Sequence, residues 1–361
     1  MRGWGARSGA RRRADAPRRP SQEEIGSPDL DPFLETHSKL LAADGALSAD
    51  GGQARPGAGS LTLGLRGAAA FEMAVATAAT DLHSGSYGGS VQNAAHAMAA
   101  AIGSLHDAKG RVAIKGFYSG VRPPRKVDRA DVAAFAAAAF DEAADLADVG
   151  ATAAVGEKGF STLERRWLRP TCDVVGAASG FAGPPGTVKT IVPATALVKV
   201  VCRLVPGQDP DAVLAAARAH VSSLRVPGAN VTFAPLPFKA TPYEIGRDAP
   251  TNVGAAAVLE EMYGSPPLST WMGGSIPATS AFKKHLGIET ALFAFGLPDD
   301  RVHAPDERYR LSQFELAREA YVRVLHFLGG GAKGEAAAVA RAEEEAEAVR
   351  RAEAAEGRGE L

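Results

Sequence analysis

Residues 190–204 read Thr-Ile-Val-Pro-Ala-Thr-Ala-Leu-Val-Lys-Val-Val-Cys-Arg-Leu. From Ala196 to Leu204 every second side chain is apolar, whereas Lys199 and Arg203 fall on the other face. Successive side chains of a strand point to opposite faces of a sheet, so this period of two predicts a long strand with one buried face. Arg203 then either covers the sheet with its aliphatic stem or directs its guanidinium at an anion.

The segments on either side of this strand predict a small α+β sandwich. The same alternation follows residue 60 and returns over residues 231–236. Apolar stripes at helical spacing predict one helix over residues 94–105 and another that begins at Asp209-Pro210. A β, α, β, α, β order of this kind suits a sheet with helices on one face. Residues 176–186 are small and predict a loop.

The two ends of the folded region have α/β texture instead. A short apolar run at residues 46–48 leads to Asp50-Gly51-Gly52, and a second apolar strand is predicted over Thr290–Phe295. Ligands bind at the carboxyl ends of strands in such sheets, so we expect Asp50 at a binding edge, although aspartate is also common in plain turns. The last helix is predicted to open with a capping box from Ser312 to Glu315.

Composition excludes several classes of function. The formal net charge of the 361 residues is −1, which gives no basic surface for nucleic acid, and no run of eighteen apolar residues predicts a membrane span. Cys172 and Cys202 lack the spacing of a disulfide framework or a zinc site, so we interpret them as core thiols in a reducing compartment. A cytoplasmic protein is predicted; the arginine-rich, acid-poor first twenty residues also fit an organelle transit peptide.

Paired acids suggest hydrolytic chemistry near the start of the chain. Glu23 and Glu24 are adjacent and precede a glycine turn, where they repel each other. One carboxylate of such a pair can hold a cation while its neighbour acts as a base towards a bound water. The plainer interpretation is a solvated helix start.

Three glycine-containing loops carry further candidate residues. His83 lies in Asp-Leu-His-Ser-Gly just before a helix, where it is either a mobile acid/base group or an ordinary surface histidine. Gly274 and Ser275 belong to a loop, Gly273–Pro277, that could hold a carboxylate or oxyanion with backbone N–H groups. His303 follows a strand in a loop whose acids could fix its tautomer.

Taken together and in this order, the motifs resemble the cytosolic non-specific dipeptidase and carnosinase branch of the aminoacylase and carboxypeptidase-G type metallopeptidases. The matching segments are Glu-Glu-Ile-Gly-Ser-Pro from residue 23, Asp-Leu-His-Ser-Gly from 81, Gly-Phe-Tyr from 116, Lys-Thr-Ile-Val-Pro from 189, Arg-Leu-Val-Pro-Gly-Gln from 203, Gly-Gly-Ser-Ile-Pro from 273 and the His303 loop. They cover residues 21 to about 330.

The resemblance implies an α/β catalytic domain with two divalent metal ions, zinc or manganese, and an inserted α+β, ferredoxin-like lid that forms a homodimer. It implies that the substrate is a small dipeptide. Glu23 would be the general base. Glu24, Asp50 and His303 would be metal ligands. Thr190 and Arg203 would take the substrate carboxylate, Gly274 and Ser275 would line the pocket, and His83 would act on the partner's scissile carbonyl.

Domain boundaries follow from the same resemblance. The catalytic domain would comprise residues 21–60 and 251–330, and the lid residues 61–250. An arginine-rich tail, 1–20, and a charged tail of Ala, Glu and Arg, 331–361, would flank them.

The sequence also departs from the family pattern. The family has a His-x-Asp motif and a metal-bridging aspartate upstream of the glutamate pair, and neither precedes Glu23 here. Three of five ligands remain, so we expect weak metal pairing and little peptidase activity, with a truncated gene model as the simplest cause. One alternative is a pseudoenzyme or dimerisation module that binds a full-length partner. Another is hydrolysis of acyl-amino acids or other amides.

Overall fold

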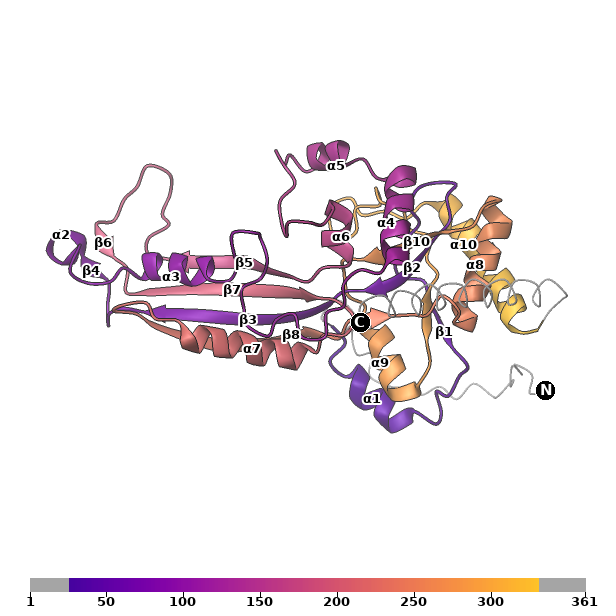
Figure 1. Cartoon of the computed structure of the whole chain (residues 1–361), viewed down its shortest axis with the longest axis horizontal. Helices are drawn as coiled ribbons and strands as arrows, with labels where there is room; N and C mark the ends of the chain where they lie inside the picture. The colour runs from indigo at the N-terminus through magenta and orange to yellow at the C-terminus, as the bar shows by residue number, and fades with distance from the viewer. Residues whose placement is uncertain (1–25, 331–361) are drawn as a thin grey trace, which may run out of the picture.

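The computed structural model describes residues 26–330, which form two bodies side by side in an elongated molecule (Figure 1). A long narrow sheet with helices along it makes up one end, and a second sheet surrounded by helices makes up the other. Between residues 26 and 330, no helix is long and apolar enough to cross a membrane.

The wider body is built on a mixed sheet with the order β1-β11-β2-β10, and β9 also pairs with β2, off this path. The sheet pairs β1 with β11 and β2 with β10 in parallel, and β2 with β11 and β9 antiparallel. Its strands are β1 (Ala46–Ser48), β2 (Ser60–Leu65), β9 (Tyr243–Glu244), β10 (Leu268–Met272) and β11 (Thr290–Leu292). The helices of this body are α1 (Leu30–His37), α8 (Pro250–Tyr263), α9 (Pro277–Leu286) and α10 (Leu311–Leu328). Leu61, Leu259 and Phe293 join α8, α10 and the sheet in one core.

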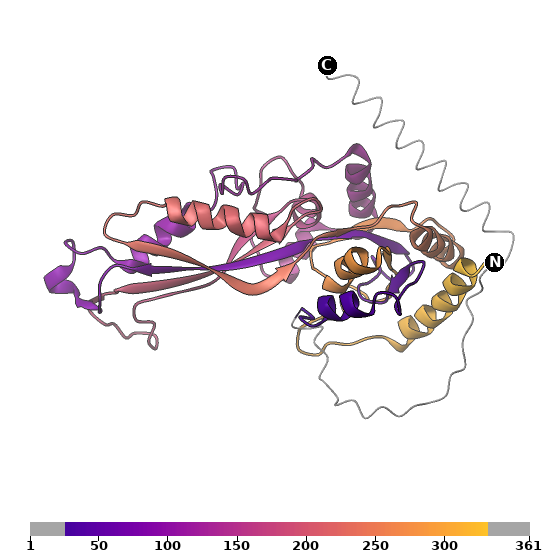
Figure 2. The ribbon, with the colours of Figure 1, turned by 90° about the horizontal axis from the view of Figure 1, so that it is seen from below.

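The lid is an antiparallel sheet with the order β5-β7-β3-β8. Its strands are β3 (Gly67–Ala76), β5 (Thr171–Ser179), β7 (Thr195–Leu204) and β8 (Asn230–Ala240), and its helices are α3 (Ala94–Gly103) and α7 (Pro210–Ser223). The alternation predicted for β7 is confirmed, because Val198, Val200 and Cys202 are fully buried. They pack with Phe71 and Met73 of β3 beneath the helices. Figure 2 shows α7 lying along the sheet.

A single residue, Arg66, separates the two sheets where β2 runs into β3. Gly67 begins β3 beside the chain that ends β8, and a Cβ atom there would lie only 2.4 Å from the carbonyl oxygen of Ala240. Glycine is therefore required for this close backbone approach. The path of the chain thus holds the two sheets together at one seam.

Three helices return to the wider body between lid strands β3 and β5. They are α4 (Lys126–Ala139), α5 (Glu142–Asp148) and α6 (Thr162–Trp167). Val132 of α4 and Leu163 of α6 pack against Leu63 and Trp271 of the mixed sheet. Although these helices lie within residues 61–250, they contribute to the core of the wider body.

The structure differs from two local expectations. The loop predicted over residues 176–186 is wrong in its first part, because β5 continues to Ser179 as the outer strand of the lid sheet. The capping box predicted at Ser312 is also wrong: α10 starts one residue earlier, after Arg310, and has no side-chain cap. Both positions are governed by tertiary packing, which overrides weak local signals.

The lid core offers a test of this packing. The Phe71 side chain is fully buried and stacks on Phe233, with 5.2 Å between ring centroids. We expect Phe71→Ala to lower the free energy of unfolding by about 3–5 kcal/mol through loss of buried apolar contacts and cavity formation. Val155→Ala, at a side chain that is 86% exposed, should change it by less than about 0.5 kcal/mol. Urea unfolding of both variants measures the difference, and equal midpoints would contradict this packing.

Candidate functional site at the seam between the sheets

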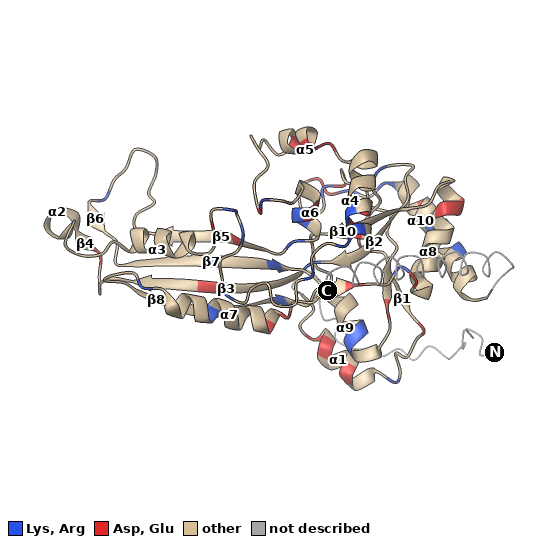
Figure 3. Cartoon of the chain, in the orientation of Figure 1, with Lys and Arg blue, Asp and Glu red and all other residues tan. Residues whose placement is uncertain are grey.

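Arg203 lies near the end of β7 that meets the wider body, where basic positions gather (Figure 3). It is directly opposite Ala68 in the pairing with β3. Its guanidinium is half-buried and donates from Nη1 to the Ser275 hydroxyl, 3.3 Å away. No acidic side chain among residues 26–330 forms an ion pair with it. The sequence-predicted pairing of Arg203 with the Gly274-Ser275 loop is therefore present in one chain.

Ser275 orients this arginine. Its hydroxyl donates to the backbone carbonyl of Arg66 at 2.6 Å and accepts from Arg203 at 3.3 Å. A serine hydroxyl has one proton, so a proton committed to the Arg66 carbonyl is not available to a ligand. Ser275 consequently positions the Arg203 fork, and the donors that face a ligand are guanidinium and backbone N–H groups.

The loop before α9 supplies those backbone groups. Gly274 and Ser275 follow β10 directly, and their N–H groups donate to no other group within the described part of the chain. A Cβ atom on Gly273 would lie 2.9 Å from Nη2 of Arg66. Glycine at that position lets the loop lie directly on a second guanidinium.

That second guanidinium, Arg66, was missed by the sequence analysis. Nε donates to the Gly273 carbonyl at 3.1 Å, and Nη1 lies 3.4 Å from the Arg169 carbonyl. Burial, together with repulsion from Arg203, lowers the pKa of Arg66 to about 10, and the carboxylate of Asp173 opposes this shift. Its signal in the sequence is the lone charge in the otherwise uncharged stretch from residue 60 to residue 71.

His83 and Thr190 lie far from this seam. His83 is the last residue of β4 (Leu82–His83), and Thr190 directly precedes β6 (Ile191–Val192). The two strands pair in a small sheet beside α2 (Ser84–Tyr87), at the opposite tip of the lid (Figure 1). The Ser84 N–H donates to the Thr190 carbonyl at 3.0 Å, so the two segments are joined. The ten residues of β3 separate tip from seam by about 30 Å. Thr190 and Arg203 of one chain therefore do not lie at the same site.

Asp50 and His303 follow neighbouring strands. Their strands β1 and β11 are parallel, and the pairing extends to a bridge between Gly52 and Gly296. Both side chains are exposed in loops beyond the carboxyl ends of these strands. Glu23 and Glu24 lie outside the described residues.

Carboxylate and imidazole are suitable donors for zinc or manganese. Between residues 26 and 330, however, no group of three His, Cys, Asp or Glu side chains is arranged to hold a metal ion. Asp50 and His303 therefore do not complete a metal site with other described residues.

The acids of the His303 loop bind arginines. Asp299 pairs with Arg308 and Arg310, and hydrogen bonds from Arg310 above all lower the pKa of Asp299 to about 2. Asp300 is buried and accepts from the Leu297 N–H at 2.7 Å and from Arg310 at 2.8 Å. These bonds fix the shape of the loop that carries His303, whose φ of 58° lies in the left-handed region.

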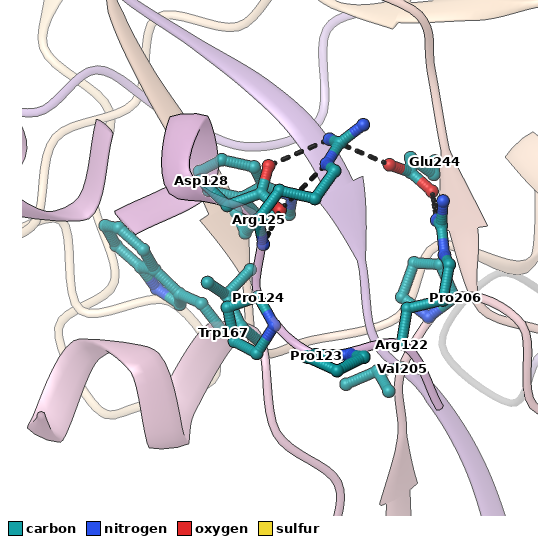
Figure 4. A pocket seen from close by; sticks show the side chains of 11 residues that line it. Arg122, Pro123, Pro124, Arg125, Asp128, Trp167, Val205, Pro206 and Glu244 are labelled. Atoms are coloured by element: carbon teal, nitrogen blue, oxygen red, sulfur yellow. Dashed lines mark hydrogen bonds and ion pairs between the residues drawn. The ribbon is translucent and has the colours of Figure 1, made fainter. Parts of the chain in front are cut away.

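A small pocket beside the seam is already filled by its own charges (Figure 4). Arg122 and Arg125 converge on Glu244, with separations of 2.5 Å and 3.5 Å, and Arg125 also binds Asp128 at 2.8 Å. The cavity volume is about 50 Å³, room for one or a few water molecules. This cluster links the strap before α4 to β9 and leaves no unpaired charge for a ligand.

Comparisons with known proteins agree with this arrangement. The sequence model of the peptidase dimerisation domain of M20 peptidases matches residues 63–229. The Cys-Gly metallodipeptidase DUG1 of Saccharomyces cerevisiae is 27% identical over 309 residues, which are 81% of this chain and 60% of that protein. The human Beta-Ala-His dipeptidase is 24% identical, over 79% of this chain and 55% of that protein.

The structure gives the same picture. The M20 family metallo-carboxypeptidase Sso-CP2 of Sulfolobus solfataricus superposes with a TM-score of 0.75 at 27% identity, over 85% of this chain and 69% of that one. The chain is thus similar to M20 metallopeptidases, and residues 63–229 match their dimerisation domain. It spans roughly 60% of the length of the curated dipeptidases it matches.

Ser275 provides a test of the seam. We expect Ser275→Ala to lower the free energy of unfolding by about 1 kcal/mol or more, because a half-buried carbonyl and guanidinium lose a shared partner. Ser280→Ala is the matched control, since that hydroxyl donates at 3.0 Å to a carbonyl in its own helix and holds no arginine. Thermal unfolding compares the two variants. An equal or larger loss for Ser280→Ala would contradict the linking role of Ser275.

Proposed function

We propose that this chain is a metal-dependent dipeptidase of the M20 family that acts on dipeptides with a free C-terminal carboxylate. The observation that carries the proposal is the Arg203 guanidinium, which is half-buried, oriented by Ser275 and without an acid partner among the described residues. A partly desolvated cation of this kind is best satisfied by an anionic ligand. The curated relatives that the chain resembles are dipeptidases.

In this proposal Arg203 and the Gly274 N–H hold the substrate carboxylate at the carboxyl end of β10. A guanidinium fork and a carboxylate can share two parallel hydrogen bonds. A C-terminal amide carries no charge and presents N–H donors to the same fork. The seam would thus reject amidated peptides, and would hold the carboxylate at a fixed distance from the reacting bond.

The metal would be held by Glu24, Asp50 and His303, with Glu23 as the base next to them. A bound zinc or manganese ion would make a water molecule more acidic at neutral pH. The described residues alone do not complete a metal site, so the proposed site depends on Glu23 and Glu24 as well as on Asp50 and His303.

We also propose a homodimer in which His83 and Thr190 serve the site of the partner subunit. The tip that carries them stands about 30 Å from the seam of its own chain, too far to reach a dipeptide bound there. The matched dimerisation domain covers the tip and most of the lid. We place the protein in the cytoplasm, where the buried thiols of Cys172 and Cys202 would remain reduced.

Hydrolysis assays test the function. With zinc or manganese added, the full chain should cleave Gly-Gly and other free dipeptides, and replacing the C-terminal carboxylate by an amide should lower kcat/KM by about 100-fold or more. Glu23→Gln should abolish turnover without changing the unfolding midpoint. A chain that dimerises but binds no metal and cleaves no dipeptide would instead be a dimerisation module for another partner.

Mixing two inactive variants tests the exchange across the dimer. His83→Ala and Arg203→Gln homodimers should each be nearly inactive. In a mixed dimer, one site combines the intact Arg203 of one subunit with the intact His83 of the other. Random exchange makes half of all dimers mixed, each with one intact site, so about a quarter of the wild-type activity should return. A mixture that stays as inactive as its components would contradict action in trans.

A further inference from the structure

Arg66 forms no ion pair within the described part of the chain, although the Asp173 carboxylate partly offsets the lowering of its pKa. Its guanidinium contacts two carbonyl oxygens, of Gly273 and Arg169, and no carboxylate within residues 26–330. Carbonyl oxygens satisfy N–H groups but leave the net positive charge in place. Burial of such a charge is unfavourable unless an anion accompanies it.

Most other buried or half-buried arginines between residues 26 and 330 bind an acid, whereas Arg165 binds the Thr162 hydroxyl. Arg169 binds Glu157 through two hydrogen bonds of 2.8 Å, Arg247 pairs with Asp131, and Arg310 binds the buried Asp300 at 2.8 Å. Arg66 and Arg203 differ from these ion-paired arginines.

One serine links the backbone at Arg66 to the side chain of Arg203. The Ser275 hydroxyl connects the Arg66 backbone to the Arg203 guanidinium, and Nη2 of Arg66 lies against Gly273. The charge of Arg203 contributes to the lowered pKa of Arg66, as expected for two cations in a partly desolvated site. Two like charges brought together at this cost are typical of a binding site for an anion.

We propose that Arg66 and Arg203 together form a paired-guanidinium site for the substrate carboxylate, with Ser275 and Gly273 setting their separation. Arg66 belongs to the β2–β3 connection and Arg203 to β7. The proposed site is therefore complete only when β3 and β7 are paired at the seam. This inference rests on the proposed function for the identity of the anion. It adds a specificity-determining residue that acts through direct contact with the carboxylate.

Binding of a small carboxylate tests the proposal without turnover or metal. The probe is N-acetylglycine, its neutral counterpart is N-acetylglycinamide, and calorimetry on the full chain measures both. Arg66→Gln and Arg203→Gln should each weaken binding of N-acetylglycine roughly 10- to 100-fold, the loss expected for a charge-assisted hydrogen bond. Neither should change the weak binding of the amide. Arg165→Gln is the matched control, since that half-buried arginine binds the Thr162 hydroxyl away from the seam.

The binding measurements separate the role of Arg66 from the proposed function. Loss of N-acetylglycine binding in Arg203→Gln but not in Arg66→Gln would overturn the role of Arg66 and leave the proposed function intact. No selective binding of the carboxylate by the wild-type chain would overturn both. If Arg66→Gln does not fold, Arg66→Lys keeps the charge but removes the fork, and it should bind N-acetylglycine with intermediate affinity. Wild-type affinity in a folded Arg66→Lys would also overturn the paired fork.

Discussion

The covalent connection of β2 to β3 through one residue is the constraint on which the rest of the molecule depends. Leu65 is paired in the wider sheet and Gly67 in the lid sheet, so the backbone of Arg66 is fixed at the boundary between the two sheets. The backbone carbonyl of Arg66, in the connection between the sheets, accepts a hydrogen bond from the Ser275 hydroxyl. Ser275 in turn orients Arg203. A structural necessity of the chain path thereby determines where the cationic groups of the site lie.

The arginines around this seam fall into two groups, those in ion pairs and those that bind only hydroxyl or carbonyl oxygens. Beside it, Arg122 and Arg125 share Glu244 and Asp128, and these pairs link the strap before α4 to the wider sheet. Exposed ion pairs of this kind each contribute little to the free energy of unfolding. Because their charges cancel, they add no net charge beside the seam. Arg66 and Arg203 form no ion pair among the described residues, so the proposed site would keep a positive field, weakened by Asp173, that attracts a carboxylate more strongly than an amide.

Much of the fold could be predicted from the sequence because its signals are local. The alternation of Phe71, Met73 and Val75 gives the buried face of β3, and Asn93 caps α3 as its position before the apolar stripe indicates. The return of α4 to the wider body could not be predicted, since an apolar stripe shows that a helix packs but not against which sheet. Arg66 was missed for a related reason: in an apolar run a lone arginine can equally lie at a strand end in solvent, and only tertiary structure places it beside Arg203. The separation of Thr190 from Arg203 likewise depends on the length of β7, which the sequence shows, and on its direction, which it does not.

The length and pairing of the lid strands also couple its two ends. From Gly67 opposite Leu204 to Ala76 opposite Thr195, β3 and β7 pair without a register shift. Ten consecutive pairs covered by α3 and α7 leave no internal hinge in the centre of the lid, because bending there would break ladder hydrogen bonds and expose the core under Val198 and Val200. A displacement of the tip must then be transmitted to the seam, where β7 ends at Arg203. A partner that grips the tip and contacts His83 would therefore also restrain the spacing between Arg203 and Ser275, so the carboxylate site and the histidine of the neighbouring subunit would be positioned by one rigid element.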